Sequence, residues 1–178
     1  MNKEEITAHV LLAKNGDTAS FCKLYELYYK DMYRYAYYML GGSDDVEDVI
    51  SETVLDAFTG IRKLKHPEKF KAWIFQILTV KCKRQIAAYV DKRQNTGDDT
   101  DLTQLKKDDH PYALSVDVQN AFKLLTDMEK TVVSLIVFGG YTSRDAAKIL
   151  KSREGTIRSL KSRAFTKMSK YLKEEDFA

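Results

Sequence analysis

The chain has little proline, glycine or cysteine, and each scarcity limits the fold classes and structural sites that it can have. Two prolines and eight glycines in 178 residues leave few helix breakers, so we predict a mostly helical protein. The two cysteines, Cys22 and Cys82, form no CxxC pair, which argues against a zinc site or a disulfide framework. We expect both to be small, buried apolar residues.

Long apolar runs and residues with enzyme chemistry are also scarce. The longest apolar run, residues 132–138, is too short to span a bilayer, and charges interrupt the first fifteen residues, so we expect no membrane segment, no secretory signal and a reducing cytoplasm. The three histidines, His9, His66 and His110, are scattered, and no Ser/His/Asp set or phosphate-binding glycine loop is present. We therefore expect no catalytic residue, no cofactor and no metal ion.

Charge is abundant and unevenly placed. The net charge is only +3, yet from Arg144 to Lys173 ten lysines and arginines stand against two acids, Asp145 and Glu154. A merely solvated surface usually interleaves both signs. We therefore predict nucleic-acid binding for this segment rather than a plain surface hairpin.

The stretch from Tyr141 to Ala164 has the pattern of a helix-turn-helix. Thr142 is a candidate N-cap for a first short helix, and a second helix is predicted to start between Ser152 and Glu154. The second helix has one apolar stripe, formed by Ile157, Leu160, Ala164 and Met168. Off that stripe lie donors suited to phosphates and base edges: Arg158, Ser159, Lys161, Ser162 and Arg163. A buried back and a donor-rich front suit a helix that lies in a major groove.

An acidic helix is predicted in the first half of the chain. Residues 18–40 form a long amphipathic helix with most of its tyrosines at the margins of the buried stripe, and Ser43 or Asp44 caps the next helix, to about Thr59. That helix contains no Lys or Arg, and one of its faces carries Asp45, Asp48, Glu52 and Asp56. Acids in the last turn oppose the helix dipole, so they call for a positive partner. Two interpretations stay open: a basic surface of another protein, or the basic segment that follows.

The segment from residue 62 to 93 is a second basic block. Its bases are Arg62, Lys63, Lys65, Lys69, Lys71, Lys81, Lys83, Arg84, Lys92 and Arg93. Pro67 fits the first position of a helix, and Trp73 is expected to anchor the core. The loop 59–66, ahead of this aromatic helix, could accept single-stranded bases.

The polar, acidic stretch that follows predicts a linker. A capping box, Thr126 with Glu129, then opens an apolar helix ahead of the helix-turn-helix. We therefore divide the chain into a domain at 1–92, an acidic linker at 93–117 and a second domain at 118–178.

Together these patterns resemble the extracytoplasmic-function (ECF, group IV) RNA polymerase sigma factors of the sigma-70 family. DDVEDVISETVLDAF followed by FKAWIFQI is similar to the family's region 2, and LLTDMEKTVVSLIVFGGYTSRDAAKIL with EGTIRSLKSRA is similar to region 4. The resemblance implies an all-α fold of two small helical domains joined by a flexible linker, the second a helix-turn-helix. It implies a protein that is not an enzyme: it directs core polymerase to specific promoters and helps melt the −10 element, on the nucleoid when active.

The resemblance also implies roles for individual residues. Those implied to contact the −35 element are Arg153, Thr156, Arg158, Ser159, Lys161, Ser162 and Arg163. Those implied to contact the −10 element are Lys63, Lys65, Lys69, Lys81 and Arg84. Those implied to bind the β′ clamp helices of the polymerase are Asp45, Asp48, Glu52 and Asp56. The other partners implied are the polymerase β flap, promoter DNA and an anti-sigma factor.

Some positions depart from the family pattern. Val80 and Arg84 stand where the family usually has Asn and Asp, so we expect either an unusual −10 preference or a different anchoring of this helix. Lys151 stands at a turn position that is often glycine, where a left-handed backbone would cost on the order of 1 kcal/mol. The alternative to a sigma factor is a self-sufficient regulator that binds duplex DNA without polymerase.

Overall fold

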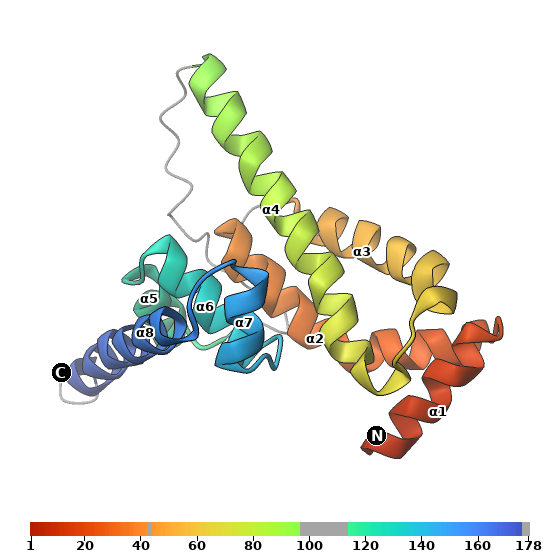
Figure 1. The fold of residues 1–178 in the computed structure, drawn as a ribbon. Coiled ribbons are helices and arrows are strands. Elements are labelled where there is room, and N and C mark those ends of the chain that lie inside the picture. The colour runs from red at the N-terminus through yellow and green to blue at the C-terminus, as the bar shows by residue number, and fades with distance from the viewer. Residues whose placement is uncertain (43, 97–113, 176–178) are drawn as a thin grey trace.

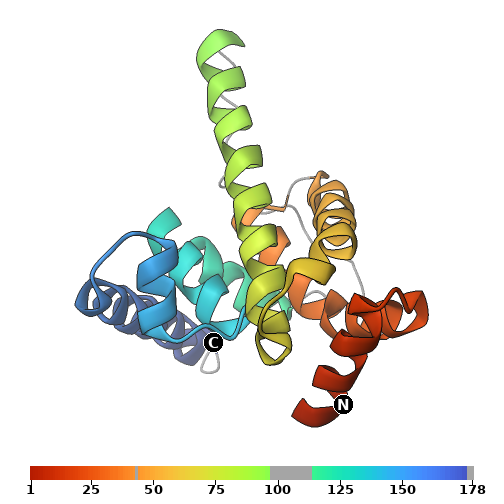
Figure 2. The same cartoon turned by 45° about the vertical axis from the view of Figure 1, so that its right-hand side comes forward.

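The computed structural model describes residues 1–42, 44–96 and 114–175. All regular structure within these ranges is helical, as predicted. The elements in chain order are α1 (Lys3–Lys14), α2 (Thr18–Leu40), α3 (Val46–Gly60), the 3-10 turns η1 (Ile61–Lys63) and η2 (Pro67–Lys69), α4 (Phe70–Thr96), α5 (Val116–Lys123), α6 (Asp127–Val137), α7 (Ser143–Ile149) and α8 (Glu154–Glu175). Helices α1–α4 and α5–α8 form two groups that lie side by side, and the C-terminal half of α4 projects beyond both (Figures 1 and 2).

Helix α2 is the centre of the first group, because it packs against α1, α3 and α4. Its inner face includes Leu24 and Tyr35, neither of which has any exposed surface. The Tyr35 ring meets Phe75 of α4 edge-on, with centroids 5.6 Å apart, and its hydroxyl hydrogen-bonds Thr79 Oγ1 at 2.8 Å. Burial of this ring also raises the pKa of Tyr35, so its hydroxyl stays neutral.

The tyrosines of α2 are more deeply buried than the sequence indicated. Tyr28 and Tyr35 lie on the predicted stripe and are buried as expected, but three tyrosines predicted at its margins are also at most 7% exposed: Tyr33, Tyr37 and Tyr38. The helix contacts α6 of the second group as well as its own neighbours, so a side chain off the main apolar stripe still meets another element. An amphipathic pattern cannot register such a second layer of packing.

The second group is built around α8. Ile157 and Ala164 have no exposed surface and Leu160 very little, so the predicted stripe is indeed the buried face, which packs on α5, α6 and α7. The capping box at the start of α6 is confirmed: the Thr126 N–H donates to Glu129 Oε2 at 2.9 Å, and the Glu129 N–H donates to Thr126 Oγ1. Lys167 Nζ of α8 lies 2.7 Å from the same Glu129 oxygen. One carboxylate therefore caps α6 and ties α8 to it.

Aromatic side chains join the two groups. The ring of Tyr38, near the end of α2, stacks on Phe138 with ring centroids 5.7 Å apart. It also packs against Phe122, with ring centroids 4.4 Å apart. The hydroxyl of Tyr141, just ahead of α7, donates a hydrogen bond to the Ala72 carbonyl in α4. The helix-turn-helix therefore begins next to the N-terminal end of α4.

Several local predictions need correction. Cys22 is exposed, whereas Cys82 is buried as expected, and burial raises the pKa of its thiol to about 12. Trp73 is only half-buried. Helix α3 starts at Val46 with Asp45 before it, and the Asp45 carboxylate makes no cap because it is turned toward α4, where Gln85 and Tyr89 donate to it.

The ends of the predicted linker also do not coincide with the helix ends in the structure. Helix α4 runs to Thr96, and α5 starts at Val116, so residues at both ends of the 93–117 segment are helical. Residues 97–113 of the predicted linker lie outside the described residues, His110 among them.

Glu129 gives a test of how the second group is held together. Burial alone would raise the pKa of this carboxyl, but Lys167 and the Thr126 N–H and hydroxyl outweigh it and hold the pKa below its usual value. Its contribution to stability is therefore present above the unfolded-state pKa and is lost as the pH falls through the lower folded-state pKa. We expect Glu129→Ala to lower the free energy of unfolding by about 1–3 kcal/mol at pH 7.

Chemical denaturation at pH 7 and in acid measures this contribution. The deficit of Glu129→Ala should shrink in acid, because the wild-type chain loses the same interactions there. Asp127→Ala is the matched control, since it removes an exposed carboxylate from the same first turn of α6. Equal destabilisation by both substitutions, or a deficit independent of pH, would contradict the assignment.

Candidate functional site

The turn between α7 and α8 fixes the direction of the long basic helix. Lys151 has φ 49°, and it is the one non-glycine residue with positive φ among those described. The left-handed residue lets the Ser152 N–H reach the Ala147 carbonyl at 2.9 Å, closing the end of α7 before α8 starts at Glu154. The start of α8 agrees with the prediction, and Lys151 has the left-handed backbone for which a steric cost was predicted.

The outward side of α8 carries the predicted donors. Four of the five donors off the stripe are exposed, namely Arg158, Ser159, Ser162 and Arg163, and so are Arg153 and Thr156. Lys161 is half-buried, because its Nζ lies 5.8 Å from the ring centre of Phe165. Arg158 Nη2 pairs with Glu154 Oε1 at 2.7 Å, but the Arg158 side chain is 72% exposed. Such an exposed pair is weak, so the guanidinium can exchange Glu154 for a phosphate.

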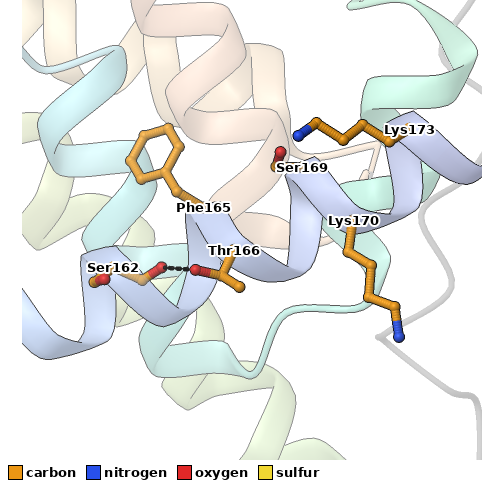
Figure 3. Close-up of a pocket in the computed structure, with 6 residues that line it drawn as sticks. All are labelled: Ser162, Phe165, Thr166, Ser169, Lys170 and Lys173. Carbon is orange, nitrogen blue, oxygen red and sulfur yellow. Dashed lines mark hydrogen bonds between the residues drawn. The ribbon is translucent and has the colours of Figure 1, made fainter.

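The basic front continues along α8 past the predicted residues. Ser162, Phe165, Thr166, Ser169, Lys170 and Lys173 line a shallow hollow on its outer side (Figure 3). Within it the Thr166 hydroxyl donates to the Ser162 carbonyl at 2.9 Å. Hydroxyl and ammonium groups therefore extend along the second half of the helix, although the sequence pattern marked donors only as far as Arg163.

The basic loop between α3 and α4 is held firmly on the first group. Leu64 is buried, and Lys14 Nζ of α1 donates to the Leu64 carbonyl at 2.7 Å. The loop's own cations point outward: the exposed side chains are Arg62, Lys63, Lys65 and Lys69. Arg84, farther along α4, is also exposed. The structure thus presents four of the five residues predicted for the −10 element at the surface.

Lys81, the fifth, has different neighbours. Its Nζ lies 2.8 Å from Asp56 Oδ2 and 3.1 Å from Glu52 Oε2, and its side chain is only 16% exposed. Asp56 first, and then Glu52, raise the pKa of Lys81 above its usual value. The residue is a firmly charged ammonium held by the acidic helix α3 rather than one directed to solvent.

Of the two interpretations of the acidic stripe, pairing with the segment that follows is partly met. Asp45 is bound by α4, and Lys81 bridges Glu52 and Asp56, so the chain's own basic segment supplies partners. The pairing is incomplete, however, because Asp48 is exposed and the side chains of Glu52 and Asp56 are 55% and 52% exposed. One ammonium cannot neutralise two carboxylates, and this face of α3 stays negative.

An exposed apolar residue beside these acids was not identified from the sequence. Leu55 is 63% exposed and lies about one turn after Glu52 on α3, whereas Phe58, at 44% exposure, packs on Phe21 of α2 with ring centroids 5.1 Å apart. A large exposed apolar residue within a charged frame is typical of a protein-binding surface. The signal was available in the sequence, because Leu55 falls outside the buried stripe of this helix. We call Asp48, Glu52, Leu55 and Asp56 the α3 outer face.

Other kinds of site find no support in the part of the chain that the structure describes. No group of three or more His, Cys, Asp or Glu residues there could hold a metal ion. Within the same residues, no helix combines the length and apolarity that crossing a membrane requires.

Two known sequence families match the chain. The family described as Sigma-70 region 2 matches residues 24–91, and the family described as Sigma-70, region 4 matches residues 121–170. The chain belongs to the sigma-70 family of RNA polymerase sigma factors. Region 2 thus contains nearly all of α2–α4, and region 4 contains the helix-turn-helix.

Full-length relatives agree with the two regions. The chain is 25% identical over 173 residues to the ECF RNA polymerase sigma factor BldN of Streptomyces coelicolor, a match that covers 92% of this chain and 64% of BldN. It is 23% identical over 171 residues to the ECF RNA polymerase sigma factor SigM of Mycobacterium tuberculosis, covering 96% of this chain and 84% of SigM. This sigma factor is of the ECF type.

A solved structure has a similar fold. The sigma factor RpoE from Bartonella quintana, in complex with the anti-sigma factor NepR, matches with a TM-score of 0.72 and 25% identity. The match covers 86% of this chain and 96% of RpoE, so it extends over both helical groups.

The turn at Lys151 yields a prediction about this helix-turn-helix. Glycine adopts φ 49° without the steric cost that a lysine bears, so Lys151→Gly should raise the free energy of unfolding by up to about 1 kcal/mol. Lys148→Gly is the control: it removes an exposed lysine within α7, and the same change in a helix should destabilise by about 1 kcal/mol. Urea titration of both variants measures the difference, and a loss of stability in Lys151→Gly would contradict the strained turn.

Proposed function

We propose that this chain is a group IV sigma factor that docks on bacterial core RNA polymerase, selects promoters through two separate basic surfaces and helps to melt the −10 element. The proposal rests on one observation. The two basic surfaces lie in the segments that match sigma-70 regions 2 and 4, on the same chain. Its place of action is then the cytoplasm, on the nucleoid. It is a binding protein in this role and catalyses no reaction itself.

Region 4 supplies contacts to the −35 element. The exposed front of α8, from Arg153 to Arg163, combines guanidinium, ammonium and hydroxyl groups that suit base edges and phosphates in a major groove. The buried back of α8 rests on three other helices, which keeps that front in a fixed orientation. The exchangeable Arg158–Glu154 pair leaves this arginine available to DNA.

Region 2 supplies contacts to the −10 element. The cations of the anchored loop, Lys63, Lys65 and Lys69, lie just ahead of α4 and its half-buried Trp73, and Arg84 lies farther along the same helix. Phosphate attraction beside an aromatic helix suits capture of unpaired bases. This capture offsets unstacking, which costs a few kcal/mol per base step.

The α3 outer face is the surface that we assign to the β′ clamp helices. It offers incompletely neutralised carboxylates beside one exposed leucine, a combination that a basic surface with an apolar patch would complement. The β flap is the expected second contact on the polymerase. Asp45 is the member of the predicted set that we leave out of this face, because it is bound within the chain.

The described arrangement of the domains is closed, and promoter binding requires it to open. Sites at −35 and −10 are separated by about 25 base pairs, or roughly 80 Å of duplex at ~3.4 Å per pair. A compact chain of this length has a radius of gyration of about 16 Å. The contacts of Tyr38 and Tyr141 must therefore break before both surfaces reach DNA. We expect an anti-sigma partner by analogy, since the similar RpoE occurs in complex with the anti-sigma factor NepR, and a partner that kept these contacts of our chain closed would keep it inactive.

Reconstituted transcription tests the promoter-binding assignment. Core polymerase with this chain should start transcription from a subset of promoters in a bacterial genomic library. Arg158→Gln and Arg163→Gln should each reduce promoter binding by the holoenzyme and lower the salt slope by about one per lost phosphate contact. Lys30→Gln, which removes an exposed charge from α2, is the control and should leave the slope unchanged.

The same measurements separate the proposal from its alternative. Tight and specific binding to duplex DNA by the chain alone, with no stimulation of core polymerase at any promoter, would identify a self-sufficient regulator. Unchanged salt slopes in both arginine variants would show that Arg158 and Arg163 do not contact DNA phosphates.

The docking assignment makes a separate prediction. Asp48→Lys and Leu55→Ala should each weaken binding to core polymerase about tenfold or more, because they remove a charge and an apolar contact that only the partner uses. Neither change should alter the thermal unfolding of the free chain, since both side chains are exposed. Leu11→Ala, on α1, is the control for an exposed leucine at 48% exposure. Wild-type affinity in both α3 variants would reject this face.

A further inference from the structure

A lysine predicted to contact DNA occupies the middle of the face assigned to the polymerase. Glu52 and Asp56 lie one turn apart on α3, and Lys81 reaches across from α4 to place its ammonium between their carboxylates, at 3.1 Å and 2.8 Å. The carboxylates are each about half exposed, while the lysine is mostly covered. The ammonium therefore binds two carboxylates of the α3 outer face from the side that faces α4.

The surroundings make this pairing exchangeable. Asp45, the remaining acid of the stripe on the α4 side, is bound by Gln85 and Tyr89 and does not compete for Lys81. Ion pairs whose carboxylates are open to solvent contribute little to stability and exchange readily. An arriving basic surface can therefore take over Glu52 and Asp56 without disturbing the packing of α3 on α4.

We propose that Lys81 is an internal counterion, which competes with core polymerase for Glu52 and Asp56 and is released when the polymerase docks. The inference rests on the proposed function, because it concerns the same docking face. In the free chain Lys81 lowers the negative charge that a partner meets. Once displaced, its ammonium lies three residues from Arg84 on α4, where it can join the surface assigned to the −10 element.

This exchange would couple the two binding events. Docking frees a cation for DNA, and DNA that attracts Lys81 frees two carboxylates for the polymerase. Such coupling is reciprocal by thermodynamic necessity. A sigma factor built this way would hold promoter DNA more tightly within the holoenzyme than as a free chain.

Removal of the lysine tests the competition directly. Lys81→Met should bind labelled core polymerase about 2–5-fold more tightly than the wild-type chain at low salt, the range expected when ion pairs with two half-exposed carboxylates no longer have to be broken. The gain should shrink as salt rises, because screening weakens both partners of the competition. Lys81→Arg, which keeps the charge in place, should restore wild-type affinity.

Lys83→Met is the matched control for net charge. It removes an exposed lysine two residues away on α4, and no ion pair of Lys83 is found among the described residues. Tighter binding in Lys81→Met but not in Lys83→Met supports the counterion. Weaker or unchanged binding in Lys81→Met overturns it, and so does an equal gain in both variants, which would reflect overall charge alone.

A double-mutant cycle connects the effect to the two carboxylates. In an E52Q/D56N background, K81M should leave the affinity unchanged, because nothing remains to be unmasked. Failure of the inference and failure of the proposed function are then distinguishable. If Asp48→Lys weakens docking while Lys81→Met has no effect, only the counterion is wrong. If neither matters, the docking face is wrong as well.

Discussion

The burial of the C-terminal half of α2, from Met32 to Leu40, is the constraint on which the rest of the structure depends. Tyr35 ties this helix to α4 inside the first domain, while Tyr38, near its end, contacts Phe122 and Phe138 of the second. Aromatic rings bury large areas and interact edge-on or stacked, so a few of them can join elements far apart in sequence. One helix thereby places both DNA-binding surfaces on a common body.

Opposite charges on neighbouring helices create a conflict that the structure only partly resolves. A sigma factor needs an acidic surface for the polymerase and basic surfaces for DNA, yet α3 and α4 lie next to each other and attract. The Asp45 carboxylate accepts hydrogen bonds from Gln85 and Tyr89. Glu52 and Asp56, in contrast, share one lysine and remain half exposed. The weak pairing keeps the acidic face usable, because strong internal neutralisation would leave nothing for a partner.

Sequence patterns predicted the helices well where the pattern and the environment agree. The stripe of Ile157, Leu160 and Ala164 is buried as periodicity indicates, and the Thr126–Glu129 capping box forms because its geometry is local. The burial of Tyr38 could not be predicted, since its cover comes from Phe122 and Phe138 of the second group, which no local pattern reveals. Lys81 shows the same limit at the site: the family resemblance implied a DNA contact for this lysine, but a tertiary contact with α3 decides where its ammonium lies.

The domain contact is of a kind that binding partners can open or hold. It uses rings and a single hydrogen bond from Tyr141, with no pairing of buried charges among the contacts described there. A ligand shifts such an equilibrium only by its differential affinity for the two states. Core polymerase and promoter DNA together favour the open state, because only that state lets two distant surfaces bind at once. A partner that touches both domains in the closed state favours the opposite. The same small aromatic contact can therefore serve activation and inhibition without any change in the fold of either domain.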